Sequence, residues 1–236
     1  MRTLPPGMAA NIAASGQQPA ISVTIQDLIN RFSQINGSGP LGTADALLLS
    51  SGTILRAAVF TNSLKLNRVT APATSSQWDT TTAVTLSSAA IQAAGCCIVQ
   101  TGTTIRVFFQ SSASGNPIRY RQSTDDGVTW GTETQFGPAV PYTNVTGITA
   151  DSTTRVWIAA YAWPNAASII YRSTGPSWLN EGPTSPVWGQ VRGLSSVTVS
   201  TTTYLVAGVQ ILFPQNGIGV AITQVSAANP PTYSAW

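Results

Sequence analysis

The chain has 236 residues, of which 43% are hydrophobic and only 8% are charged, and its formal net charge is +3. Charged residues make up roughly 25% of an ordinary soluble domain, so Ser, Thr, Gly and backbone groups must supply most of the wetted surface. The hydrophobic fraction and the seven Trp residues exclude a disordered chain. The basic residues are scattered, which argues against nucleic-acid binding, and no apolar run reaches the roughly 18 residues of a membrane-spanning helix.

Residues 1–43 form a segment without internal repeats, which we expect to dock the chain on a larger assembly. Its pattern predicts, in chain order, a short helix, a strand, a second apolar stretch and a Gly/Ser loop, over residues 8–14, 20–26, 28–35 and 36–39. Pro5, Pro6 and Gly7 interrupt the first residues and no continuous apolar stretch follows them. A secretory signal peptide is therefore not indicated.

Residues 44–236 contain a repeat of about 49 residues. Three apolar runs begin at Thr103, Ser152 and Thr201, and they place Arg106, Arg155 and Tyr204 at intervals of 49 residues. An earlier run from Gly52 places Arg56 fifty residues before Arg106. Repetition at such a period indicates a solenoid, a propeller or an array of similar units.

Each repeat unit reads as four short strands separated by Gly, Asn, Pro, Ser and Thr. A strand candidate precedes each of the apolar runs, another follows it, and a shorter fourth strand is expected near Trp78, Trp130, Trp178 and Tyr233. Four strands per unit predict an all-β fold of β-propeller-like repeats. The expected units are residues 44–90, 91–142, 143–191 and 192–236. Four units leave open whether the propeller is complete or belongs to a larger one.

The turn between the third and fourth strands of the second unit has a distinctive sequence. Its spacing is S-x-D-x-G-x-T-W, with fixed positions at Ser123, Asp125, Gly127, Thr129 and Trp130. This pattern resembles the Asp-box of sialidase-type (BNR-repeat) propellers. The third unit keeps only a partial version between Ser173 and Trp178.

The Asp-box resemblance implies a structural role for the turn rather than catalysis. It implies that Asp125 accepts hydrogen bonds from its own turn, that Gly127 adopts a positive φ, and that Trp130 packs between blades. The neighbouring Asp126 is expected to be an exposed turn residue, with calcium binding as the alternative.

Catalytic, metal and cofactor sites are not predicted. The sialidase resemblance implies an Arg triad, a Tyr nucleophile with a Glu partner and an Asp acid/base, and we assemble no such set from the eight acidic residues. The chain is therefore expected not to be an enzyme. Because there is no His and the only cysteines are the adjacent Cys96 and Cys97, zinc and haem sites are excluded. Two buried thiols are expected, with a strained vicinal disulfide as the alternative.

The first 60 or so residues resemble the N-termini of siphophage tail-associated proteins. The resemblance rests on an Ala-rich start and on the pattern P-x-[IV]-x-V-x-[IV]-x-D from Pro19 to Asp27. It implies a structural virion protein of the tail or tail tip, located in the virion, with other tail proteins and further copies of itself as partners. Such a protein leaves the host cell by lysis and therefore needs no signal peptide.

A host surface glycan is a further expected partner. Tyr161 and Trp163 in the "YAWPN" stretch are the candidate contacts, because Pro164 and Asn165 indicate an exposed connection between strands. The alternatives are a sialidase-like glycoside hydrolase and a secreted, extracellular carbohydrate-binding propeller.

Overall fold

The computed structural model describes residues 44–60, 62–70, 82–91, 94–138, 145–151, 155–162, 167–173, 178–182, 190–199, 202–211 and 217–225. The chain divides into two units, Met1–Ser38 and Gly39–Trp236, and all described residues belong to the second. The helix, strand and loop expected within residues 1–43 therefore lie outside the described residues. So do two of the expected fourth-strand markers, Trp78 and Tyr233.

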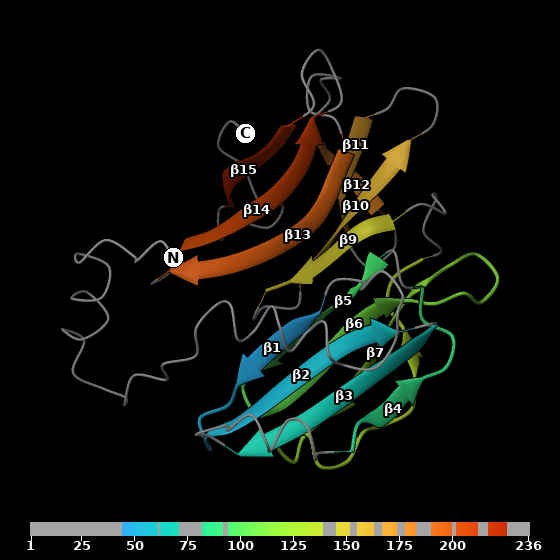
Figure 1. The fold of residues 1–236 in the computed structure, drawn as a ribbon, viewed down its shortest axis with the longest axis vertical. Helices are drawn as coiled ribbons and strands as arrows, with labels where there is room; N and C mark the ends of the chain where they lie inside the picture. The colour runs from blue at the N-terminus through green and yellow to red at the C-terminus, as the bar shows by residue number, and fades with distance from the viewer. Residues whose placement is uncertain are drawn as a thin grey trace. The chain divides into compact units, whose positions relative to one another are not determined.

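The described residues form fifteen strands in four antiparallel sheets, each built in chain order (Figure 1). Sheet 1 contains β1 (Asp45–Leu48), β2 (Thr53–Phe60), β3 (Ser63–Thr70) and β4 (Val84–Ser87). Sheet 2 contains β5 (Cys96–Thr101), β6 (Thr104–Gln110), β7 (Ile118–Ser123) and β8 (Thr134–Gln135). Sheet 3 contains β9 (Val145–Ala150), β10 (Val156–Ala162), β11 (Ala167–Ser173) and β12 (Trp178–Gly182). Sheet 4 contains β13 (Gln190–Val199), β14 (Thr202–Ile211) and β15 (Gly217–Val225).

These sheets are the blades of a β-propeller, and the predicted all-β fold class is confirmed. The first, second and third strands of every unit fall where the repeat predicts them. β13 begins at Gln190, two residues before the expected start of the fourth unit at 192. Among the described residues, no helix is both long and apolar enough to cross a membrane.

Tight turns between neighbouring strands fix the register of each sheet. In sheet 2, Thr101 pairs with Thr104 across a two-residue connection, in which Gly102 has a φ of 59°. Two-residue hairpins favour such positive φ values, because their backbone twist matches that of the flanking strands. The sequence predicts a Gly-containing turn between the first two strands of the unit. This turn therefore sets the register of β5 against β6.

Three hydrophobic clusters join the sheets in chain order. The first contains Leu55, Leu66 and Phe109 and joins sheets 1 and 2. The second contains Phe108 and Ile158 and joins sheets 2 and 3. The third is built around Trp157, Ile170 and Leu205 and joins sheets 3 and 4. Because alternate residues of a strand point to opposite faces, one strand serves two clusters, as Phe108 and Phe109 do.

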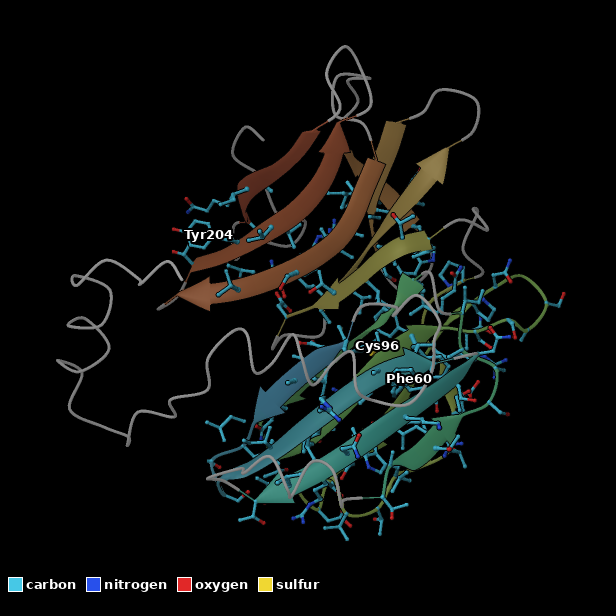
Figure 2. All side chains as sticks on the ribbon, in the orientation of Figure 1. Phe60, Cys96 and Tyr204 are labelled. Carbon is cyan, nitrogen blue, oxygen red and sulfur yellow. The ribbon has the colours of Figure 1, made fainter. Side chains whose placement is uncertain are left out.

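The repeat spacing of 49 residues is kept from sheet 2 to sheet 3. Phe108 packs toward sheet 3, and Trp157, 49 residues later, packs toward sheet 4. Arg106 lies 5.8 Å from the centre of the Tyr120 ring, and Arg155 lies 5.4 Å from that of Trp157. Both cations thus lie over an aromatic ring, which is a favourable electrostatic arrangement. The third expected member of this series, Tyr204, is a half-buried residue on β14 (Figure 2).

The fifty-residue equivalence of Arg56 with Arg106 is wrong. Leu55 and Ala57 both belong to the cluster between sheets 1 and 2, so Arg56 between them points away from sheet 2. Ile105 and Val107 belong to the same cluster, so Arg106 points away from sheet 1 instead. A shift of one residue in a strand moves every side chain to the opposite face. Arg56 is accordingly buried on the other side of its own sheet, where it donates to Asn67 at 3.3 Å.

Candidate functional site

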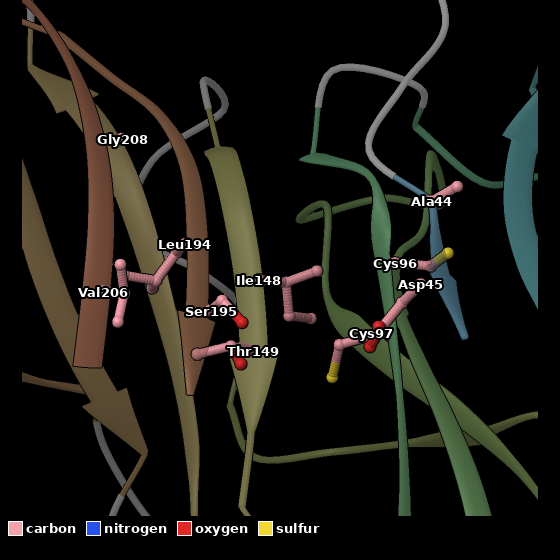
Figure 3. A pocket seen from close by; sticks show the side chains of 10 residues that line it. All are labelled: Ala44, Asp45, Cys96, Cys97, Ile148, Thr149, Leu194, Ser195, Val206 and Gly208. Carbon is pink, nitrogen blue, oxygen red and sulfur yellow. The ribbon is translucent and has the colours of Figure 1, made fainter. Parts of the chain in front are cut away.

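A cavity of about 300 Å³ lies where the first strands of the four sheets meet. We call it the inter-sheet cavity. Its walls come mainly from β1, β5, β9 and β13, with a contribution from β14 (Figure 3). The residues that line it are Ala44, Asp45, Cys96, Cys97, Ile148, Thr149, Leu194, Ser195, Val206 and Gly208. Small-molecule sites are typically concave and mostly apolar with a few polar groups, and this volume is at the lower end of their range.

Asp45 supplies the carboxylate of the inter-sheet cavity. Its Oδ2 accepts a hydrogen bond from the backbone N–H of Ile98 on β5 at 2.9 Å, and its Oδ1 accepts one from Ala46 at 2.9 Å. Burial raises the pKa of this carboxyl, and the two backbone N–H groups oppose that rise. Asp45 therefore joins sheets 1 and 2 through one oxygen and still presents acceptor capacity to the cavity.

Hydroxyl groups occupy the opposite side of the cavity. Thr149 on β9 donates to Ser196 on β13 at 3.2 Å, and Ser196 donates to the carbonyl of Ala150 at 2.7 Å. These bonds join sheets 3 and 4. Ser195 is exposed and, like Thr149, lines the cavity (Figure 3). The cavity thus has a carboxylate at one inter-sheet junction and hydroxyls at another.

Cys96 and Cys97 line the cavity as buried thiols and not as reactive thiolates. Both are buried, and neither forms a disulfide. Figure 3 shows their side chains diverging from adjacent positions of β5, and they belong to different hydrophobic clusters. Burial, with the Asp45 charge as a second cause, raises the pKa of each thiol far above its ordinary value. The expectation of two buried thiols is confirmed.

The Ser123–Trp130 turn lies outside the cavity, between β7 and β8. Asp125 Oδ1 accepts from the Thr129 N–H at 2.9 Å and from the Ser123 hydroxyl at 2.7 Å. Its Oδ2 accepts from the Thr129 hydroxyl at 2.6 Å. These donors, the Thr129 hydroxyl first, lower the pKa of Asp125 to about 2. The carboxylate is exposed to solvent and these hydrogen bonds are all local, so it organises its own turn.

The same turn also contacts the preceding sheet. Gly127 has a φ of 76° and lies against Leu55 of β2. Arg68 of β3 donates to the backbone carbonyl of Asp126 at 3.0 Å. Trp130 is half-buried against the cluster between sheets 1 and 2, and its indole N–H donates to the Gly127 carbonyl at 3.1 Å. Through these contacts the turn packs sheet 2 against sheet 1.

The candidate glycan contacts lie partly outside the described residues. Tyr161 belongs to β10 and pairs with Ser168 of β11. Trp163 lies outside the described residues.

Two further acidic residues are engaged in ion pairs away from the cavity. Glu133 pairs with Arg119 at 2.9 Å and accepts from the Ser87 hydroxyl of sheet 1 at 2.9 Å. Asp151 pairs with Arg155 at 2.6 Å. Within the described part of the chain, no cluster of three or more His, Cys, Asp or Glu residues is arranged to hold a metal ion.

Sequence reasoning did not find the inter-sheet cavity. It treated Asp45 only as one of eight acidic residues. One signal for the cavity was available in the sequence. Asp45 stands at the start of the first strand of its unit, and the first strands of the following units recur about 50 residues later.

Comparisons with known proteins identify no family for this chain. No protein-family model and no curated protein matches the sequence. Among solved structures, NanB sialidase from Streptococcus pneumoniae is 14% identical with a TM-score of 0.49, over 74% of this chain and 28% of that chain. An α-L-arabinanase from Cellvibrio cellulosa is 11% identical with a TM-score of 0.48, over 84% of this chain and 78% of that chain. The SapL1 lectin, solved with α-methyl fucoside, is 14% identical with a TM-score of 0.46, over 81% and 62% of the two chains.

These comparisons correct one expectation. The chain was expected not to be an enzyme, and that expectation is contradicted, because hydrolases stand among its structural neighbours beside a lectin. The chain spans only 28% of the NanB chain. At such identities and TM-scores an activity must be argued from this chain's own residues.

Proposed function

We propose that this chain is a carbohydrate-binding β-propeller module and that the inter-sheet cavity is its binding site. The observation that carries the proposal is the composition of the cavity. One carboxylate and two hydroxyl side chains, from Asp45, Thr149 and Ser195, lie among apolar walls. Sugars present hydroxyl donors together with apolar C–H faces, and a site of this mixed character suits both.

The test is direct binding of the full chain to an immobilised glycan panel, followed by calorimetry with the glycans retained. Binding of a defined glycan with a stoichiometry near one per chain supports the proposal. Failure to retain any glycan contradicts it. Each retained glycan is also incubated with the protein and analysed for released sugar, so that turnover is detected as well as binding.

We further propose that the module belongs to the tail or tail tip of a phage virion, where it contacts host surface glycans and assembles with other tail proteins and copies of itself. Support comes from the pattern between Pro19 and Asp27 and from the low charge of the chain. Tail parts follow rotational symmetry, so several copies are expected together. Tyr161 and Trp163 are proposed as a second glycan contact.

Immunogold labelling of purified particles with an antibody against residues 44–236 tests the virion assignment. Label on the tail or tail tip supports it. Label absent from particles, with the protein present in the medium or in cells, overturns it and favours a secreted carbohydrate-binding protein. Neither labelling result tests the carbohydrate-binding proposal, which the glycan panel decides.

A further inference from the structure

We propose that the inter-sheet cavity selects an uncharged sugar unit with neighbouring hydroxyl groups and rejects anionic sugars such as uronic and sialic acids. This inference rests on the proposed carbohydrate-binding function and specifies the class of ligand.

The charge of the cavity differs in sign from that of the whole chain. The chain carries a formal net charge of +3, but the described residues that line the cavity include one carboxylate, Asp45, and neither Lys nor Arg. The two thiols in the lining remain protonated because burial strongly disfavours their charged forms. A ligand carboxylate in this space would therefore meet a like charge, with no compensating cation among the described lining residues, and partial burial strengthens that repulsion.

The hydrogen-bonding capacity of Asp45 fits two neighbouring hydroxyl donors. An ionised carboxylate offers about four acceptor positions on its two oxygens. The backbone N–H groups of Ile98 and Ala46 use one position on each oxygen. One position on each oxygen then remains, and two adjacent hydroxyls of a sugar ring can donate to both at once. Such charge-assisted bonds are stronger than bonds between neutral groups.

The remaining walls suit a single sugar ring. Ile148, Leu194 and Val206 supply apolar surface, and Thr149, which donates its own hydroxyl hydrogen to Ser196, offers its oxygen as an acceptor. The volume of about 300 Å³ corresponds to the smallest small-molecule sites, which favours one sugar unit over an oligosaccharide inside the cavity.

The experiment compares sugars that differ only at C6, where one member of each pair carries a charge. Methyl glycosides of glucose, galactose and mannose are titrated against the full chain, each beside the corresponding methyl uronide, in which a carboxylate replaces the C6 hydroxymethyl group. We expect the neutral member of the best-binding pair to bind at least about tenfold more tightly than its uronide.

Two variants assign that preference to the cavity. Asp45→Asn keeps the size of the side chain and an acceptor for Ile98, and it should weaken neutral binding while reducing the preference to within about threefold. Ser195→Arg adds a cation at an exposed lining position and should strengthen uronide binding. Asp126→Asn is the matched control: it removes the same charge from the Ser123–Trp130 turn, outside the cavity, and should leave both affinities unchanged.

The outcomes separate this inference from the proposed function. Equal or tighter binding of uronides by the wild type overturns the inference and leaves carbohydrate binding in place. An unchanged preference in Ser195→Arg also overturns it, and this variant decides the matter even where Asp45→Asn fails to fold. If neither neutral glycosides nor uronides bind, both proposals fail.

Discussion

Gly127 and Leu55 meet across the junction between sheets 2 and 1. A Cβ added to Gly127 would stand 2.8 Å from Leu55 Cδ2 and 2.9 Å from Leu55 Cδ1. Real Cβ atoms do not approach so closely without displacement of a neighbour, so this glycine permits the close packing of the turn on β2. Leu55 belongs to the hydrophobic cluster between sheets 1 and 2, against which Trp130 packs, so the contact couples a local turn to the packing of two sheets.

We expect Gly127→Ala to destabilise the protein more than Gly102→Ala does. Both glycines have positive φ values, 76° and 59°, so each Ala incurs about 1–2 kcal/mol of backbone strain. A Cβ at Gly102 meets nothing within 4 Å, whereas one at Gly127 must displace Leu55, which adds about 1–3 kcal/mol. Chemical denaturation of the two variants measures the difference. Equal loss of stability in both would show that the contact with Leu55 does not constrain the turn.

Asp125 should stabilise the fold in a pH-dependent manner. Its pKa is lowered to about 2 from an ordinary 3.8, so its contribution is complete above about pH 4 and is lost as the pH falls through about 2. We expect Asp125→Asn to lower the thermal midpoint at pH 7, with a difference from wild type that shrinks between pH 4 and pH 2. Asp126→Asn serves as the control. A pH-independent difference would contradict the assigned role of the carboxylate.

Cys96 and Cys97 should resist alkylation in the native protein. Their thiolates are suppressed by burial, so iodoacetamide at pH 8 should react at least about a hundredfold more slowly than in urea. Mass spectrometry after unfolding without reductant should then show two added groups. Rapid native labelling would mean that β5 opens readily, and the absence of labelling in urea would mean that the cysteines are oxidised.

Trp163→Ala should leave folding intact and weaken the attachment of particles to host cells. The prediction follows from the proposed exposed aromatic contact, in which a Trp ring stacks on a sugar. Adsorption rates of mutant and wild-type particles, together with the thermal midpoints of the purified chains, provide the measurement. Unchanged adsorption would remove Tyr161 and Trp163 from the proposed contact.

The sequence was sufficient for the first three strands of each unit, but not for every fourth strand or for the faces that the strands present. β4 begins at Val84 and β8 at Thr134, after the positions expected near Trp78 and Trp130. Polar turns and apolar runs at 49-residue intervals located β6, β10 and β14, because these features are local. The equivalence of Arg56 with Arg106 failed because β2 starts one residue after Gly52, whereas β6 starts two residues after Gly102. This difference of one residue turns every side chain of the strand to the opposite face, and the composition of the strand does not indicate it.

The inter-sheet cavity could not be predicted for a related reason. Asp45 and Thr149 lie about a hundred residues apart, and they line one space only because consecutive sheets pack in order around it. Neither residue stands in a short motif, so chain spacing gave no indication of their proximity. The Ser123–Trp130 turn, by contrast, was visible because its hydrogen bonds connect residues within four positions of one another.

The most direct test of carbohydrate binding in the inter-sheet cavity is glycan binding by the variant Ser195→Trp. Ser195 is exposed at the lining of the cavity, so an indole ring there should obstruct the space without disturbing the hydrophobic clusters. We expect that the wild type binds at least one glycan of the panel and that this variant, with an unchanged thermal midpoint, loses that binding. Retention of wild-type affinity by Ser195→Trp would contradict the assignment of the cavity as the binding site.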